Sequence, residues 1–336
     1  MSFVITQDGL SKLVNEWLAQ GKRVAGPSRV KPDCILYVPL QRPDQLLFED
    51  FIRPANSLKE FLFPKHEGLF GYRINGNGVE LIEFESPQTE QMLIAARPCD
   101  AAALPILDHV FNWDCADESY NRRRQLTTVV TLACLSYDDA CFCTSVGLGP
   151  CAERGSDVML LKLDGGRYEV RCYTDKGRSL MEGRLEPSDQ VAGKPLGPEK
   201  RFDPAQVREF VKNNFASDFW QSEGLTCLGC GTCAYTCPTC HCFDIIDEGN
   251  TNEGARVRMW DSCQFSTFTQ HASGHNPREN QPSRQRQRIS HKFDIYPQKF
   301  GEILCTGCGN CTRNCPVGIG VLSILTEIGH GEHLQA

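Results

Sequence analysis

Two copies of one cysteine spacing constrain this chain more than any other feature of its sequence. Each copy has three cysteines at intervals of two residues, then a fourth cysteine that precedes a proline. The copies are Cys227-x2-Cys230-x2-Cys233-x3-Cys237-Pro238 and Cys305-x2-Cys308-x2-Cys311-x3-Cys315-Pro316. This spacing is typical of proteins that hold a pair of 4Fe-4S clusters, in which the fourth cysteine ligates the other cluster. We therefore expect two loops that face each other across two iron–sulfur cubes.

The same pattern assigns each cysteine of the repeat to a cluster. The first set is Cys227, Cys230, Cys233 and Cys315, and the second set is Cys305, Cys308, Cys311 and Cys237. Zinc is the alternative, because paired Cys-x2-Cys motifs also make zinc sites. A zinc ion takes four thiolates and needs neither the third cysteine of each loop nor the proline. The spacing therefore favours iron–sulfur clusters.

Composition limits the class of protein. A chain of 336 residues has room for two domains with separate cores. The start of the sequence lacks a signal peptide, so the 19 cysteines are expected to stay reduced in the cytoplasm and to bind metal. No apolar run approaches the ~20 residues of a membrane span. The net charge of -7 argues against a nucleic-acid partner.

Helix and strand signals alternate in residues 1–185. Apolar residues at helical spacing predict a helix over 10–18, followed by apolar, β-rich runs. The predicted strands are 34–40, 79–84, 92–96 and 127–135, with helices at 101–111 and 116–125 and a β-hairpin formed by 157–163 and 168–173. This alternation predicts a layered α/β domain.

The remaining sequence is expected to form a second domain. Residues 186–203 are rich in proline, glycine and charge, which indicates a linker. A helix is expected from Pro204 to about Trp220. Residues 204–336 are predicted to be a mostly α-helical, ferredoxin-like domain with two clusters and a long insertion, 238–304.

A third metal site is predicted in the α/β domain. Cys99 follows the predicted strand 92–96, Cys134 lies near the end of strand 127–135, and Cys141 and Cys143 occupy the next loop. Open α/β sheets bind ligands at the carboxyl ends of their strands, so these four thiols are expected to converge on a 4Fe-4S cluster. A helix that begins near Asp100 would direct N–H groups at the anionic cluster. A zinc site and buried structural cysteines are the alternatives.

Other cysteines have less distinctive surroundings. Cys240, Cys242 and Cys263 are either additional ligands or thiols that support the clusters, and we favour the supporting role. The isolated cysteines are expected to be structural, although Cys151 is close enough to Cys143 to replace a member of the third site. These isolated residues are Cys34, Cys115, Cys151 and Cys172. A basic stretch, 284–292, either lies beside the clusters or is solvated.

Motifs for substrate chemistry are missing from the sequence. There is no G-x-G-x-x-G after a strand, no P-loop and no H-E-x-x-H, and no catalytic residue is predicted. A chain with clusters and no nicotinamide or flavin motif is expected to move electrons between other chains.

Four short phrases resemble one protein family. They are Arg97-Pro98-Cys99-Asp100-Ala101, Cys141-Phe142-Cys143-Thr144-Ser145, Cys237-Pro238-Thr239-Cys240-His241-Cys242-Phe243 and Ser273-Gly274-His275-Asn276-Pro277-Arg278. The family contains the beta (iron–sulfur) subunits of cytoplasmic nickel–iron sulfhydrogenases, and the electron-input subunit of anaerobic sulfite reductase is similar. So are the iron–sulfur subunits of flavin oxidoreductases that feed heterodisulfide reductases. The resemblance is strongest over 92–320.

The resemblance implies a role in a larger complex. In the sulfhydrogenase branch, this subunit relays electrons between a flavin subunit that binds NAD(P)H, with its own iron–sulfur site, and the nickel–iron hydrogenase pair. The sulfite reductase and heterodisulfide branches imply other catalytic partners. An iron–sulfur redox sensor is the alternative of a different class, and an N-terminal cluster that binds substrate is another. Three cysteines around that cluster would favour substrate binding, whereas four would favour relay.

Overall fold

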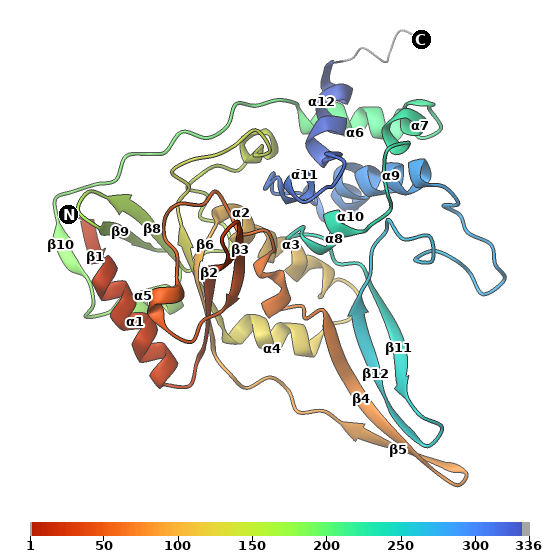
Figure 1. Ribbon diagram of the computed structural model, residues 1–336, viewed down its shortest axis with the longest axis horizontal. Helices are drawn as coiled ribbons and strands as arrows, with labels where there is room; N and C mark the ends of the chain where they lie inside the picture. Colours follow the sequence, from red (N-terminus) through yellow and green to blue (C-terminus); the bar gives the residue numbers. More distant parts are fainter. Residues whose placement is uncertain (1, 331–336) are drawn as a thin grey trace.

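The larger of two β-sheets has eight strands and mixed direction. The computed structural model describes residues 2–330 (Figure 1). The strand order is β10-β1-β9-β8-β7-β6-β2-β3. The strands are β1 (Ser2–Thr6), β2 (Arg23–Lys31), β3 (Cys34–Pro39), β6 (Gln91–Ala96), β7 (Thr127–Leu132), β8 (Val158–Leu163), β9 (Arg167–Cys172) and β10 (Glu186–Ser188). The central strands β2, β6, β7 and β8 are parallel, and the outer pairs are antiparallel.

Helices cover both faces of this sheet. On one face, α1 (Gln7–Ala19) begins at Thr6, whose side chain accepts a hydrogen bond from the Gly9 N–H, and packs Trp17 against β6 and β7. On the other face lie α2 (Pro98–Ala101), α3 (Ala103–Val110) and α4 (Glu118–Leu126). Strands β6 and β7 are therefore buried along their whole length, as expected for parallel strands covered on both faces. The mixed α/β prediction for this region is confirmed.

Four antiparallel strands form a second sheet. Its order is β11-β12-β4-β5, with β11 (Phe243–Gly249), β12 (Glu253–Trp260), β4 (His66–Asn75) and β5 (Gly78–Glu83). This sheet projects as an arm at the lower right of Figure 1. The predicted strand 79–84 exists, but it belongs to this arm and not to the α/β sheet. Because β12 pairs with β4, the arm combines strands from both sides of residues 186–203.

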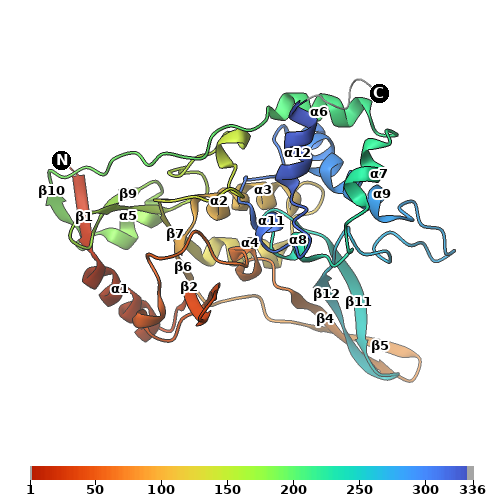
Figure 2. The same ribbon diagram turned by 45° about the horizontal axis from the view of Figure 1, so that its top comes forward.

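The region after residue 203 contains short helices in addition to β11 and β12. They are α6 (Pro204–Asn213), α7 (Phe219–Gly224), α8 (Thr232–Tyr235), α9 (Gln281–Ser290), a π-helical turn (His291–Ile295), α10 (Tyr296–Phe300), α11 (Asn310–Arg313) and α12 (Val321–His330). Several of them gather at one end of the molecule, as the rotated view also shows (Figure 2). The expectation that this region is mostly helical therefore overlooked the hairpin β11–β12, because its partner strand β4 lies about 180 residues earlier, beyond the range of local sequence patterns.

The prediction of a single helix over 204–220 is wrong. The chain leaves the helix at Asn214 and starts a second one at Phe219. The break lets Trp220 turn into the helical core, where its indole N–H donates to the Asn214 carbonyl oxygen at 2.8 Å. Residues 189–203 have no regular structure, whereas 186–188 form the edge strand β10.

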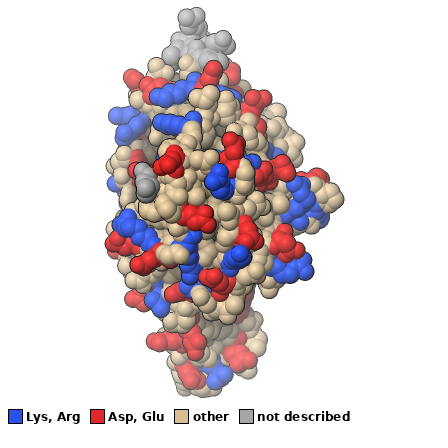
Figure 3. Space-filling view, turned by 90° about the vertical axis from the view of Figure 1, so that its left-hand side faces the viewer, with Lys and Arg blue, Asp and Glu red and all other residues tan. Residues whose placement is uncertain are grey.

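Surface properties agree with the modest net charge. Lysine, arginine, aspartate and glutamate side chains are interspersed on the face that Figure 3 presents. Within residues 2–330, no helix is long and apolar enough to cross a membrane.

A buried ion-pair network anchors the arm to the α/β sheet. Arg258 on β12 pairs with Glu67 on β4 and with Asp117, the N-cap residue of α4. Arg123 of α4 also pairs with Glu67, at 2.5 Å. The Arg258 and Glu67 side chains are only 5% and 4% exposed, so each charge depends on its partners for solvation.

Removal of this buried cation should destabilise the protein. Arg258→Ala is expected to lower the free energy of unfolding by about 3–5 kcal/mol, because Glu67 is left buried with less compensation. Arg256, on the same strand, pairs with Asp247 in a 46% exposed ion pair. Arg256→Ala should therefore cost much less than Arg258→Ala. Anaerobic chemical unfolding of the two variants tests this, and equal losses would contradict it.

Candidate metal centres

The second cysteine loop depends on two glycines in left-handed backbone conformation. Gly307 has φ +64° and Gly309 has φ +76°, and the Gly307 N–H points at the Cys305 sulfur at 3.5 Å. In the first loop, Gly229 and Gly231 have φ +66° and +72°. Each loop then enters a one-turn helix, α8 or α11, and these two helices contact each other. The two copies of the sequence repeat therefore form similar loop–helix units, which contact each other through α8 and α11.

Cys237, from the first copy, lies beside the second loop. Burial raises the pKa of the Cys305 thiol to about 12 against the opposing effect of Lys292, and the nearby Cys237 adds to the rise. Cys237 likewise contributes to the raised pKa of Cys308, after burial. The Cys308 thiol is also close enough to Cys311 to be affected by it. The four cysteines assigned to the second cluster are therefore neighbours.

The first loop is less enclosed. Cys227 accepts hydrogen bonds from the side-chain amides of Gln281, at 3.2 Å, and Gln285, at 3.0 Å. Cys230 is exposed, whereas Cys233 is close to Cys227 and to a cysteine outside the motif, Cys263. The fourth predicted ligand, Cys315, is half-buried and follows α11, the helix that packs on α8.

The four cysteines of the predicted third site line one cavity. Cys99 lies in α2, directly after β6, and Cys134 follows β7, the parallel neighbour of β6. Cys141 and Cys143 come from the next loop and complete the lining, which also includes Cys308 of the second cysteine loop. Cys151 is outside this lining and packs beside Ala133, Met159 and Leu161. The convergence expected from the ends of parallel strands is present in the structure.

Arg53 connects this cavity to the second loop. Its Nη2 donates to both carboxylate oxygens of Asp100, at 2.8 and 2.9 Å. Its Nη1 lies 3.2 Å from the Cys99 sulfur and 3.2 Å from the Cys308 carbonyl oxygen. Arg313 makes a similar bridge, from the Cys141 sulfur at 2.9 Å to the Cys308 carbonyl oxygen at 2.7 Å. Two arginines therefore border the cavity, and each is also paired with a carboxylate, Arg53 with Asp100 and Arg313 with Asp138.

Buried cations also accompany the cysteines of the repeat. Lys292 is 3% exposed, and its Nζ lies 3.5 Å from the Cys237 sulfur. Arg288 is also 3% exposed, and its Nε and Nη2 have no hydrogen-bond partner. Burial opposes the charge of Arg288, but the neighbouring cysteines Cys233 and Cys311 hold its pKa above the ordinary value. The spacing of four residues between Arg288 and Lys292 places both on the inner side of the helix, so the solvated interpretation of this stretch is wrong for them.

These surroundings fit iron–sulfur clusters. Clusters ligated by four thiolates carry net negative charge, which compensates buried guanidinium and ammonium groups that would otherwise be costly. Burial raises the pKa of Cys143 to about 12, so the free thiol stays protonated and metal binding would displace its proton. Within residues 2–330, no three Cys, His, Asp or Glu side chains meet the arrangement needed to bind one metal ion.

Sequence reasoning missed the basic residues contributed by the N-terminal half. Arg53 and Lys59 lie in a segment with no cysteine and no recognised motif. Lys59 is 2% exposed and donates to the carbonyl oxygens of Ala234, at 3.0 Å, and Cys240, at 2.8 Å. Nothing in the local sequence separates these two cations from the other basic residues, because their position depends on packing between distant segments.

Equivalent glycines in the two copies of the repeat allow a matched test of the contact between the second loop and the Cys143 backbone. A Cβ on Gly307 would lie 2.5 Å from the backbone nitrogen of Cys143, whereas one on Gly229 would first meet the flexible Gln281 side chain at 3.1 Å. Gly229→Ala should cost about 1–2 kcal/mol, because alanine is strained at positive φ. Gly307→Ala should cost about 1–3 kcal/mol more through the backbone clash. Comparison of the two variants by anaerobic chemical unfolding measures the difference, and equal stabilities would show that the loop does not press on Cys143.

Comparisons with known proteins agree with this arrangement. The family model for the 4Fe-4S dicluster domain matches residues 226–319, which contain both cysteine loops. No solved structure matches the chain. Sulfhydrogenase 2 subunit beta of Pyrococcus furiosus is 30% identical over 295 residues, covering 84% of this chain and 85% of the relative. The resemblance noted in the short cysteine phrases is thereby confirmed, and the chain belongs to the family of sulfhydrogenase beta subunits.

Proposed function

We propose that this chain is the iron–sulfur electron-transfer subunit of a hydrogenase-type complex. It would relay single electrons between a flavin subunit that binds NAD(P)H and a catalytic nickel–iron subunit pair. One observation carries the proposal: the cavity lined by Cys99, Cys134, Cys141 and Cys143 is also lined by Cys308 of the second cysteine loop. The cysteines of the N-terminal cavity therefore adjoin the second cysteine loop, which in turn adjoins the first loop.

The contacts between these groups support a continuous route. Arg53 touches both Cys99 and Cys308, so the N-terminal cavity and the second loop share a side chain. Cys311 of the second loop is near enough to Cys233 of the first to add to the rise in the pKa of Cys233, which burial dominates. Clusters bound at the three groups would supply one-electron redox chemistry. The pair of electrons of one hydride could then pass through the chain singly.

The chain's own residues would hold and tune the clusters. Cys237, Cys308 and Cys311 are buried, which excludes water from the second cluster. Lys292 and Arg288 place positive charge beside the thiolates, which favours the reduced state of a cluster and raises its potential. Cys230 is exposed, so the first cluster would lie nearest to the surface and to an electron-exchanging partner.

Four cysteines around the N-terminal cavity also bear on the alternatives. An iron with an open coordination position for substrate would be expected where a cluster has only three thiolates, and this cavity is lined by four cysteines of the N-terminal half. The arrangement thus favours relay over substrate binding. A sulfite reductase or a flavin oxidoreductase that feeds heterodisulfide reductase would use the same subunit, and the catalytic subunit that copurifies distinguishes them.

Metal content tests the third cluster. The double variant Cys99→Ser/Cys134→Ser should lose about four irons and four acid-labile sulfides per chain, because one 4Fe-4S cluster cannot form. Cys115→Ser, at an exposed thiol away from the cavity, is the control and should keep the wild-type content. Iron, sulfide and zinc are measured together on anaerobically purified protein. Loss of zinc instead of iron would assign the site to zinc, and no loss would leave these thiols a packing role.

Interruption of the relay tests the function. Cys230→Ser in the assembled complex should lower NAD(P)H-linked hydrogen turnover by about tenfold or more, because one cluster of the route is lost or altered. Reduction of an artificial dye by the flavin subunit, and hydrogen oxidation measured with a dye at the catalytic subunit, should both persist. Unchanged NAD(P)H-linked turnover in a variant that has lost its cluster would exclude the relay.

A further inference from the structure

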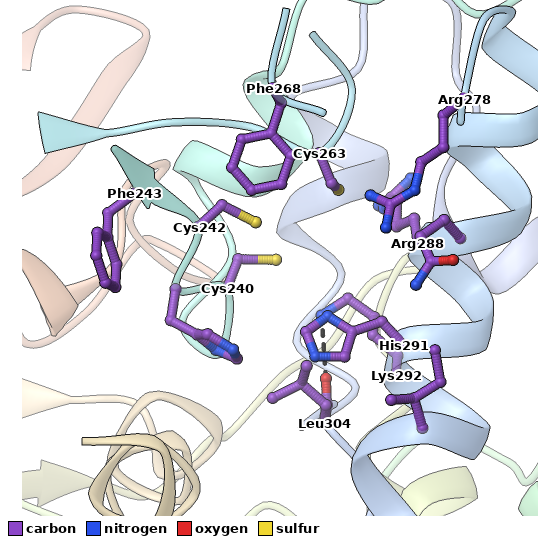
Figure 4. A pocket seen from close by; sticks show the side chains of 13 residues that line it. Cys240, Cys242, Phe243, Cys263, Phe268, Arg278, Arg288, His291, Lys292 and Leu304 are labelled. Atoms are coloured by element: carbon purple, nitrogen blue, oxygen red, sulfur yellow. Dashed lines mark hydrogen bonds between the residues drawn. The ribbon is translucent and has the colours of Figure 1, made fainter. Parts of the chain in front are cut away.

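A further cavity contains three cysteines that belong to neither the repeat nor the N-terminal site. It has a volume of about 390 Å³ and lies between the segment 240–243, the loop after β12, and helix α9 with the π-helical turn (Figure 4). Cys240 and Cys242 line it from one segment, and Cys263 lines it from the loop. In Figure 4 the sulfur atoms of Cys240 and Cys242 point into the space that faces Arg288 and His291.

The three thiols lie close to one another and to the paired clusters. Cys242 and Cys263 are close enough for each to shift the pKa of the other, since Cys263 raises the pKa of Cys242 and Cys242 lowers that of Cys263. Cys240 is likewise close enough to Cys237, the expected cross-ligand of the second loop, for each to shift the pKa of the other. Cys263 lies near Cys233 of the first loop. This cavity thus adjoins both loops of the repeat.

The walls of the cavity suit an anionic occupant. Arg288 and Lys292 line it and are each 3% exposed, and Arg278 lines it as well. The Nε and Nη2 atoms of Arg288 are buried without a hydrogen-bond partner, so two donor nitrogens lack an acceptor. The imidazoles of His241 and His291 complete the polar lining.

We propose that Cys240, Cys242 and Cys263 bind an additional iron–sulfur cluster, separate from the clusters of the repeat and from the N-terminal site. Thiolates are the usual ligands of such clusters, and histidine nitrogen can replace cysteine on an iron, so His241 or His291 is the candidate for the remaining position. The cavity is larger than one metal ion requires, and a cluster presents several sulfur acceptors to the unpartnered N–H groups of Arg288.

The position of this site has a consequence that rests on the proposed electron-transfer function. Two side chains of its wall, Phe243 and Ile295, are 37% and 43% exposed, so the cavity reaches the molecular surface. A cluster here would provide a second place where a partner subunit exchanges electrons with the paired clusters. The metal site itself does not depend on that role, because it is tested by composition.

Additivity of iron loss separates this site from the repeat. Cys242→Ser and Cys230→Ser should each lower the content by about four irons and four sulfides per chain, and the combined variant by about eight. If Cys263 serves instead as a ligand of the first cluster, Cys263→Ser combined with Cys230→Ser should lose only about four irons, which would overturn the proposal. An unchanged iron content in Cys242→Ser would overturn it too. Cys115→Ser is the control, and none of these differences depends on whether the N-terminal cluster or the relay exists.

Thiol labelling of the wild-type protein covers the case in which a variant does not fold. In anaerobically purified, loaded protein, Cys242 and Cys263 should resist iodoacetamide, and removal of iron with a chelator should make both reactive. Cys115 should be labelled in both states. Labelling of Cys242 and Cys263 in the loaded protein would overturn the proposal, since a ligating thiolate is blocked by its iron.

Discussion

The structure depends on a balance between buried cations and cysteine thiolates. Arg53 comes from the N-terminal half of the chain and Arg288 and Lys292 come from the C-terminal half, yet each is buried beside cysteines. Such charges are expensive to bury unless an anion compensates them, and the thiols alone are protonated when buried. Asp100 compensates Arg53, and anionic clusters would supply the charge that Arg288 and Lys292 lack, so folding and cluster binding should be coupled. The cations would then destabilise an empty fold and support a loaded one.

The two halves of the chain interlock around these groups. Strand β12 pairs with β4, and Arg258 holds the same strands through buried carboxylates. The Phe142 N–H donates to the Gly307 carbonyl oxygen at 2.9 Å, which joins the N-terminal cavity to the second cysteine loop. Because Gly307 has no side chain, the backbone of the Cys143 segment can approach closely. Cofactors held this way would keep fixed separations, which suits transfer between neighbouring clusters better than a flexible tether.

The two copies of the internal repeat have the same cysteine spacing, but their cysteines differ in burial and in neighbouring side chains. The second loop is covered by the N-terminal half, with Cys308 and Cys311 buried, whereas Cys230 of the first loop is exposed. Burial, hydrogen bonds and nearby charge set cluster potentials, so clusters bound at the two loops would differ in potential. The side-chain amides of Gln281 and Gln285 donate hydrogen bonds to the Cys227 sulfur, and the Lys292 ammonium donates to the Cys237 sulfur. A difference of this kind gives a relay its direction.

The sequence by itself determined the cysteine loops, the strands β3 and β6–β9, the helices α1, α3 and α4, and the position of Cys99 and Cys134 at adjacent strand ends, whereas the central strand β2 was not predicted. These features depend on spacing and periodicity over a few residues, which local sequence records. Only the tertiary structure decided that β4 pairs with β12, that the helix expected over 204–220 divides at Asn214, and that Arg53 and Lys59 are buried among cysteines. It also gathered Cys240, Cys242 and Cys263 around one cavity. These outcomes depend on packing between segments up to about 250 residues apart, because burial and charge pairing are properties of the whole fold.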